Sequence, residues 1–283
     1  MIRRLLMFSL LLFASSHSYA DSCGNQAPPN SAPSQASAAG FDTLVFYDQF
    51  SQINLNNTAN NKSSEPWTAG FWFLPPQNDH FMINDGSAGT CGLTLMNDWT
   101  NASSQFATIV SHPRTTKTDT GTTFLYGYFE ASLRFRQKSS EQAGSTNNFG
   151  AFYLWSQSYT EHTDGYPENQ EYCEIDIAEM SGAHFINNPE MHDWTVINGV
   201  TAGSSKPSVL QNTSPIDPMD GQFHTYGLLW ENGRMQWYID NILQLTETSY
   251  AICNTDRQIL VLQSGSHGHD DQITDVQWVR VWH

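Results

Sequence analysis

The stretch E-Y-C-E-I-D-I-A-E-M, residues 171–180, brings three acids together: Glu174, Asp176 and Glu179. A helix turns by about 100° per residue, so spacings of two and three residues would scatter the three carboxylates around it. The isoleucines between the acids favour a strand, on which side chains alternate between two faces. We therefore predict a strand over this stretch.

Simple alternation places Glu174 and Asp176 on one face of that strand and sends Glu179 to the other. One β-bulge around Ile177 and Ala178 adds a residue and restores the phase, so that all three acids share a face. The Cα atoms of the two glutamates then lie roughly 13 Å apart. Side chains that lean together bring their carboxyl groups to roughly 5–6 Å, the separation of a retaining glycosidase.

Three acids this close do not all ionise at their ordinary pKa values, so one should hold a proton at neutral pH. A protonated acid beside a charged nucleophile is the pair that glycoside hydrolysis needs. The alternatives are a solvated charged strand and a calcium site. A charged strand calls for a basic partner, and the nearest in sequence are the distant Lys138 and Lys206. Calcium sites usually take their ligands from loops. These arguments favour catalysis.

Strand signals recur after residue 41, whereas helix signals are weak. Runs rich in β-branched and aromatic residues span 44–50, 92–99, 106–112, 125–136, 149–156, 224–245, 258–264 and 276–282. Turn residues at 231–233 and 240–241 divide the run 224–245 into hairpins. The longest loops are expected at 51–70, 137–148, 157–170 and 198–222. We predict an all-β fold, a sandwich of antiparallel sheets.

The N-terminal composition is typical of an exported protein. Residues 1–20 combine two arginines, an apolar run and a small-residue cleavage site, and are read as a signal peptide. Residues 21–40 are mostly Pro, Ser, Ala and Gln, which predicts a flexible leader. Residues 41–283 form the expected catalytic domain. No later apolar run is long enough to span a bilayer, so we expect a secreted protein, extracellular or periplasmic, without membrane contact.

The charge excludes several partners. The formal net charge is −16, and removal of the signal peptide makes it two units more negative. Such a chain repels nucleic acid and disfavours a densely sulfated polymer. Aromatic residues make up 13% of the chain, with nine Trp, which suits both a large core and sugar stacking. We expect a monomer whose partner is a polysaccharide.

Four cysteines, Cys23, Cys91, Cys173 and Cys253, are the only ones in the chain. In an exported protein they allow two disulfides, in any of three pairings. Free buried thiols are the alternative. No cysteine or histidine spacing indicates zinc, and we predict no metal ligands. Alternation on the acidic strand sends the side chain of Cys173 into the packed layer, away from the three acids.

The motif E-I-D-I-A-E resembles the E-x-D-x-x-E signature of glycoside hydrolase family 16, which includes laminarinases, agarases and carrageenases. Further blocks similar to the family's strands follow in family order, at 44–50, 126–131, 150–155, 223–240 and 279–281. The resemblance implies a β-jelly-roll of two antiparallel sheets with a concave substrate cleft. It also implies that Glu174 is the nucleophile, that Glu179 is the acid/base, and that Asp176 hydrogen-bonds the nucleophile.

Aromatic residues near the motif are the candidates for substrate binding. Tyr153 stands where the family has a tryptophan, and Trp155 follows two residues later on the same strand face. His192 and Trp194 are expected on the next strand beside the acids. We predict that all four contact the sugar. The alternatives are core packing for the tryptophans and a surface loop for His192.

Two departures from the family bear on metal and substrate. Gln277 replaces the usual closing aspartate, with Asp275 two residues earlier, which argues against the structural calcium of many relatives. No cofactor is required. The block 259–263 lacks the N-x-A-V-G-G ending common in laminarinases. The expected function is retaining endo-hydrolysis of a neutral polysaccharide, β-1,3-glucan or mixed-link β-1,3/1,4-glucan first. An agar-type galactan hydrolase, a cell-wall transglycosylase and a non-catalytic lectin are the alternatives.

Overall fold

The computed structural model describes residues 29–50, 55–56, 66–70, 81–85, 91–96, 107–111, 122–137, 149–161, 171–181, 186–187, 191–197, 200–206, 216, 220–248, 252–264 and 272–283. At some strand ends, and throughout 55–56, 81–85, 186–187, 191–197 and 200–206, only the backbone is described. The expected signal peptide lies outside these residues. None of the helices in the described part of the chain is long and apolar enough to cross a membrane.

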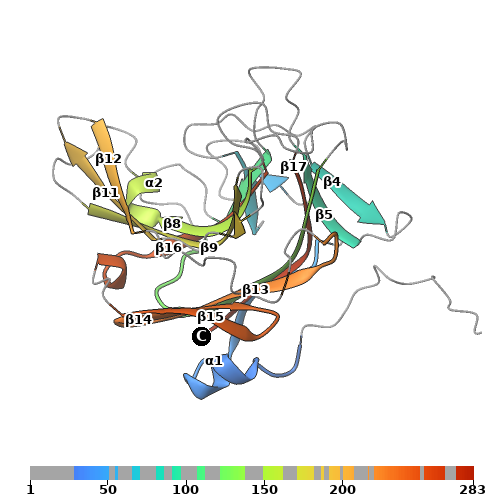
Figure 1. The fold of residues 1–283 in the computed structure, drawn as a ribbon, viewed down its shortest axis with the longest axis horizontal. Coiled ribbons are helices and arrows are strands. Elements are labelled where there is room, and N and C mark those ends of the chain that lie inside the picture. The colour runs from blue at the N-terminus through green and yellow to red at the C-terminus, as the bar shows by residue number, and fades with distance from the viewer. Residues whose placement is uncertain are drawn as a thin grey trace, which may run out of the picture.

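The described strands form two sheets that pack face to face (Figure 1). Sheet A has the order β15-β14-β13-β7-β17-β5-β4, with β1 also paired to β17. Its strands are β1 (Leu44–Asp48), β4 (Phe81–Asp85), β5 (Cys91–Met96), β7 (Gly127–Gln137), β13 (His224–Glu231), β14 (Arg234–Ile239), β15 (Ile242–Glu247) and β17 (Gln272–Trp282). All its pairings are antiparallel.

Sheet B has the order β12-β11-β9-β8-β16-β6-β3-β2, with β10 also paired to β9. It is antiparallel except for the short β2–β3 pair. Its strands are β2 (Leu55–Asn56), β3 (Trp67–Ala69), β6 (Ala107–Val110), β8 (Phe149–Ser156), β9 (Glu171–Ser181), β10 (Ile186–Asn187), β11 (Met191–Ile197), β12 (Val200–Lys206) and β16 (Gln258–Ser264). The all-β sandwich predicted from the sequence is confirmed.

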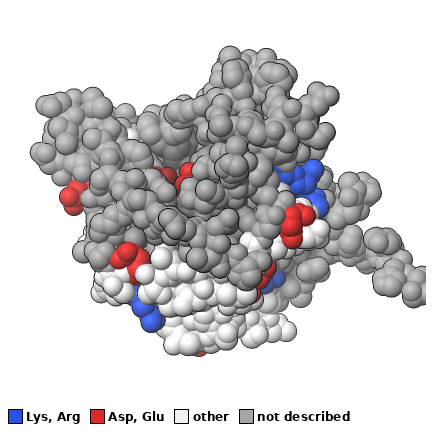
Figure 2. Space-filling view, viewed as in Figure 1, with Lys and Arg blue, Asp and Glu red and all other residues white. Residues whose placement is uncertain are grey.

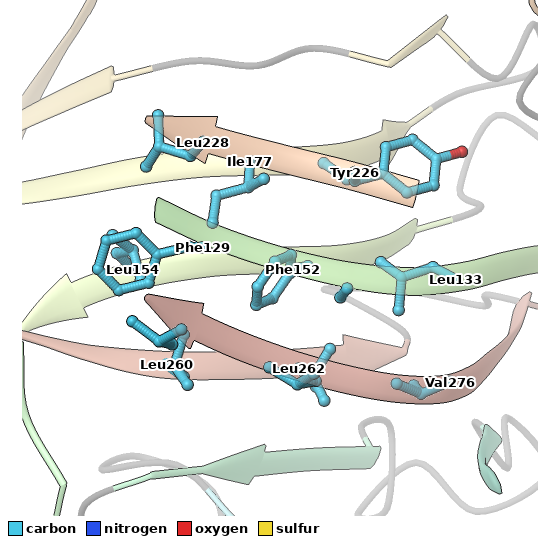
Figure 3. Packing of buried hydrophobic residues seen from close by; sticks show 14 of the residues in the cluster. Phe129, Leu133, Phe152, Leu154, Ile177, Tyr226, Leu228, Leu260, Leu262 and Val276 are labelled. Carbon is cyan, nitrogen blue, oxygen red and sulfur yellow. The ribbon is translucent and has the colours of Figure 1, made fainter. Parts of the chain in front are cut away.

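The core fills the space between the two sheets (Figure 3). Apolar side chains that alternate along each strand meet there, as in other aligned sandwiches. Sheet B contributes Phe152, Leu154, Ile177, Leu260 and Leu262, and sheet A contributes Phe129, Leu133, Tyr226, Leu228 and Val276. Alternation leaves the other face of sheet B, called here the outer face, pointing away from the core.

The hairpin turns of sheet A follow the sequence. Asp240 and Asn241 both have positive φ, 49° and 65°, as a two-residue turn of type I′ requires. Gly233 has φ 78° in the preceding turn. Three expected loops are wrong in part, because residues 55–56 and 67–69 form β2 and β3, residues 157–161 form a short helix, and residues 200–206 form β12. The strand β12 is the longest of these. This strand is polar, and its backbone hydrogen bonds with β11 place it at the edge of sheet B.

Residues 29–40 correct the expected flexible leader. They contain the short helix α1 (Ser34–Ala38), which lies on the side of sheet A away from sheet B (Figure 1). Ala36 is fully buried against Tyr128. The side-chain amide of Gln35 donates to the Tyr128 hydroxyl at 2.7 Å and to Asn241 Oδ1 at 2.8 Å. The sequence of this segment has the composition of a linker and does not predict this packing, because Ala36 is buried by side chains from strands far away in the sequence.

Candidate active site

The pairing of β8 with β9 contains a β-bulge. Phe152 lies opposite Ala178, whereas the next residue, Tyr153, lies opposite Asp176. Ile177 is therefore the extra residue on β9, and the register shifts by one position there. A bulge at Ile177–Ala178 was predicted from the spacing of the acids alone, and the register confirms it.

The bulge brings the three acids to the outer face of sheet B. Directly opposite residues of an antiparallel pair point to the same face. The opposed pairs are Glu174 with Trp155, Asp176 with Tyr153, and Glu179 with Ala151. Cys173, just before the first acid, and Ile175, Ile177 and Ala178, between the acids, are buried in the core on the other face. Asp176 is buried, and the two glutamates are partly exposed.

An apolar and aromatic cluster surrounds the acids on this outer face. Its members come from β6, β8, β9, β16 and α2 (Gln157–Glu161), and are Val110, Ala151, Tyr153, Trp155, Tyr159, Tyr172, Ile259 and Val261. Burial on the outer face lowers the local polarity, which strengthens interactions among charges. Tyr153 and Trp155, the two residues of β8 that are predicted to contact substrate, belong to this cluster and lie on the strand next to the acids.

The helix α2 completes the cluster. Ser156 caps it, because the Ser156 hydroxyl accepts a hydrogen bond from the backbone N–H of Tyr159 at 3.0 Å. The ring of Tyr159 packs edge-on against Trp155, with centroids 5.2 Å apart, and against Tyr172 at 4.7 Å. Trp155 is only 6% exposed, so neighbouring residues cover most of its indole ring.

The hydroxyl of Tyr153 lies close to all three acids. Burial raises its pKa well above the ordinary value, and the charges of Glu174, Asp176 and Glu179 raise it further. The phenol thus stays protonated. It donates a hydrogen bond to Gln263 Oε1 at 3.1 Å.

Gln263 is a residue of this face that the sequence analysis did not single out. It lies opposite Ala151, which in turn lies opposite Glu179, so the three residues form one row across the sheet. Gln263 is the one polar residue in the run I-L-V-L-Q at 259–263, and it is buried. A buried amide needs hydrogen-bond partners, and this was the signal that could have marked it.

The strand β11 lies beside β9 on the other side, as predicted. His192 is opposite Glu174, and Trp194 is opposite Tyr172. Both positions therefore belong to rows that cross the acid-bearing part of the outer face. Their side chains lie outside the described residues, so their contact with substrate stays a prediction.

A disulfide joins Cys173 to Cys253, with Cα atoms 5.2 Å apart. It ties β9 to η3 (Ile252–Asn254) on the core side, behind the acids. The sequence left the pairing open, and only the fold brings residues 80 positions apart into contact. The side chains of Cys23 and Cys91 lie outside the described residues.

Asp275 and Gln277, the two residues considered for the family's calcium site, both form hydrogen bonds with other side chains. Asp275 accepts hydrogen bonds from Arg134 and Arg136, and Gln277 Oε1 accepts one from the Ser132 hydroxyl at 2.7 Å. Within the described ranges, no three His, Cys, Asp or Glu side chains are grouped so as to hold a metal ion.

Comparison with known proteins agrees with this arrangement. The family model described as Glycosyl hydrolases family 16 matches residues 84–265, more than half of the chain. No curated protein sequence matches this chain.

Solved structures share the fold at low sequence identity. An endo-glucanase of this family from Bacteroides ovatus is 17% identical, with a TM-score of 0.56 and coverage of 84% of this chain and 99% of that chain. The kappa-carrageenase from Pseudoalteromonas carrageenovora is 18% identical, with a TM-score of 0.51 and coverage of 83% and 92%. A laminarinase catalytic domain from Thermotoga petrophila is 15% identical, with a TM-score of 0.51 and coverage of 85% and 97%.

The family match places the chain in a class of enzymes that hydrolyse glycosidic bonds. The chain belongs to glycosyl hydrolase family 16 and is an endo-acting glycoside hydrolase. The retaining mechanism is general to this family.

Proposed function

We propose that the chain is a secreted endo-β-glycanase that cleaves a neutral polysaccharide with retention, using Glu174 as nucleophile and Glu179 as acid/base. The register shift between β8 and β9 is the observation that carries this assignment, because it puts both glutamates on one face with Asp176 between them. Without the shift Glu179 would point into the core.

The reaction runs in two displacements. Glu179 first donates its proton to the glycosidic oxygen while the Glu174 carboxylate attacks C1, so the C1–O bond breaks and a glycosyl ester forms. Glu179, now ionised, then takes a proton from water, whose oxygen attacks C1 and releases Glu174. The two inversions restore the starting configuration. An acceptor sugar in place of water gives transglycosylation.

Asp176 and Tyr153 shape the charge around the two glutamates. Asp176 is buried between them, and its proximity disfavours a second charge nearby. This interaction helps Glu179 to hold its proton until the leaving oxygen takes it. Tyr153 remains protonated beside the three acids and hydrogen-bonded to Gln263. Trp155, His192 and Trp194 are proposed to contact the sugars.

The first substrate proposal is β-1,3-glucan or mixed-link β-1,3/1,4-glucan. The solved structures include an endo-glucanase and a laminarinase with this fold. The net charge of −16 disfavours a sulfated polymer. On the face drawn in Figure 2, the described basic side chains lie in small separate groups, not in one broad patch. The block 259–263, which contains Gln263, departs from the laminarinase pattern. We therefore propose an agar-type galactan as the second candidate substrate.

Reducing-end assays on laminarin, lichenan, agarose and carrageenan test the substrate. We expect new reducing ends from laminarin or lichenan, with oligosaccharides as early products because cleavage is internal. Proton NMR of the first product should show the β-anomer before mutarotation. Release from agarose alone would replace the glucan by a galactan. An α-anomer as first product would overturn the retaining mechanism, and no cleavage of any polymer would overturn the glycanase.

Addition of an acceptor oligosaccharide separates hydrolysis from transfer. If the main products are longer than the starting chains, the protein is a transglycosylase in function. If they stay shorter, water is the acceptor that matters. Binding to a polymer without any cleavage would instead indicate a lectin.

A further inference from the structure

One hydrogen bond crosses the core from sheet A to the catalytic strand. The indole N–H of Trp237, on β14, donates to the backbone carbonyl oxygen of Asp176 at 2.8 Å. Trp237 is 1% exposed and otherwise packs among apolar core residues. Its polar contact is therefore with the backbone of a proposed active-site residue in the opposite sheet.

The carbonyl that receives this bond lies at the bulge. Asp176 directly precedes Ile177, the residue that the β8–β9 register leaves out of the ladder. A bulge disrupts the regular ladder hydrogen bonds, and a buried polar group then needs another partner. The tryptophan supplies that partner from a rigid ring that is fixed on the other sheet, so it also fixes where the carbonyl points.

We propose that Trp237 is a positioning residue for the reaction. Its N–H holds the Asp176 carbonyl, which keeps the bulge at Ile177 and thereby keeps Glu179 turned toward Glu174. The inference rests on the proposed roles of these two glutamates. A regular strand without the bulge is the competing arrangement, and in it Glu179 faces the wrong side.

The chain contains a matched control. Trp230, on the neighbouring strand β13, is also fully buried in the same core. Within the described part of the chain, its indole N–H has no hydrogen-bond partner. Its ring packs against Tyr126, with centroids 5.2 Å apart. W237F and W230F therefore remove the same atoms from the same core, but only W237F removes a bond to the catalytic strand.

The values of kcat/KM on substrates with two kinds of leaving group report whether Glu179 is positioned to donate its proton. Laminarin needs a proton from Glu179 when the bond breaks, whereas 2,4-dinitrophenyl β-laminaribioside releases a stable anion without one. For W237F we expect kcat/KM on laminarin to fall by about 10²-fold, the cost of a displacement of about 1 Å. On the dinitrophenyl substrate kcat/KM should stay within about threefold of the wild type, because protonation is not needed there. W230F should change both substrates equally and little.

Hydrogen–deuterium exchange of the peptide spanning 176–180 gives a readout that does not depend on activity. We expect faster exchange in W237F than in the wild type, and no difference between W230F and the wild type. Equal exchange in the two variants, or equal losses on both substrates, would overturn the positioning role. If the wild type leaves laminarin intact, the glucan proposal fails, and the exchange contrast alone decides the inference.

A variant closer in shape covers the case in which W237F does not fold. Benzothienylalanine, introduced at position 237 by suppression of a stop codon, keeps the bicyclic ring and replaces the N–H by sulfur. We expect the leaving-group dependence and the faster exchange to persist in this variant. Wild-type behaviour of both readouts would show that the ring shape, not the hydrogen bond, holds the strand.

Discussion

The acids on the outer faces of the two sheets have different neighbours. On sheet A, Asp275 is ion-paired with Arg134 and Arg136, and Glu130 is paired with Arg280. On sheet B, Glu174, Asp176 and Glu179 lie together. The strands around them, β6, β8, β9 and β16, contain no lysine or arginine.

We interpret the difference as one between acids that stabilise the fold and acids that we propose carry out the chemistry. Asp275 is held by two arginines, its pKa is lowered and it keeps its charge, and its ion pairs link β17 to β7. Carboxylates gathered on strands without lysine or arginine have no cation on those strands to offset their mutual repulsion. Both faces are built from alternating strands, and they differ in where the arginines lie.

Replacement of Glu174 gives the largest expected effect. E174Q removes the attacking carboxylate without changing its shape, and we expect kcat on the preferred polysaccharide to fall by roughly 10⁴–10⁶-fold. Binding of the polymer should persist, as affinity electrophoresis can show.

Its control is E130Q on sheet A. Burial raises the pKa of Glu130, with Arg280 and Trp282 opposing this less strongly. Glutamine therefore resembles the form that burial favours, and we expect activity within about threefold of the wild type. A loss in E130Q as large as that in E174Q would remove the distinction between the two faces.

E179A should depend on the leaving group. On polysaccharide we expect a loss of about 10²–10⁴-fold in kcat/KM, because the leaving oxygen is no longer protonated. On a dinitrophenyl glycoside kcat/KM should be almost unchanged, and added azide should raise kcat by attacking the glycosyl ester. The product would then be a β-glycosyl azide, visible by NMR. A loss of equal size on both substrates contradicts the acid/base role.

D275N should affect stability and spare catalysis. It leaves Arg134 and Arg136 without their shared carboxylate, which we expect to lower the free energy of unfolding by about 3 kcal/mol, measured in urea. Burial raises the pKa of Asp275, but hydrogen bonds from Arg136 and Thr94 and the arginine charges outweigh it, so the pKa is lowered. The stabilisation is therefore present above the unfolded pKa near 4 and is lost as the pH falls through the folded value.

The control for D275N is the pH profile of kcat, which should match that of the wild type. A shifted profile would show that this ion pair on sheet A is coupled to the acids on sheet B.

H224Q should give the smallest effect, with the opposite pH dependence. Burial lowers the pKa of His224, but hydrogen bonds to Asp240 at 2.7 Å and to Asp220 at 3.1 Å outweigh it, so the pKa is raised. The stabilisation is fully present below pH of about 6.5 and is lost as the pH rises through the folded value. We expect H224Q to lower the free energy of unfolding by about 1 kcal/mol at pH 5.5, because both partners are exposed.

The stability difference should shrink toward zero at pH 9, as thermal unfolding at several pH values can measure. A difference that grows with pH would mean that the neutral ring is the stabilising form.

The sequence predicted the bulged strand that carries the three acids, but not the contacts that support this strand. The spacing of Glu174, Asp176 and Glu179 predicted the bulge, because a strand has a period of two and the third acid is one residue late. Gln263 was missed because its role depends on a row of three strands. Residues 29–40 were misjudged because their composition is that of a linker, whereas the burial of Ala36 depends on the aromatic rings of sheet A.

Local alternation, turn residues and charge can be read along the chain, and they determined the two-sheet sandwich, the face that carries the acids and the negative net charge. The tertiary structure decided the contacts between residues far apart in sequence. These are the Cys173–Cys253 disulfide, the arginines over Asp275, and the Trp237 bond to the Asp176 carbonyl. The physical reason is that a side chain's partners across a sandwich are set by how the two sheets stack, and no local pattern encodes that register.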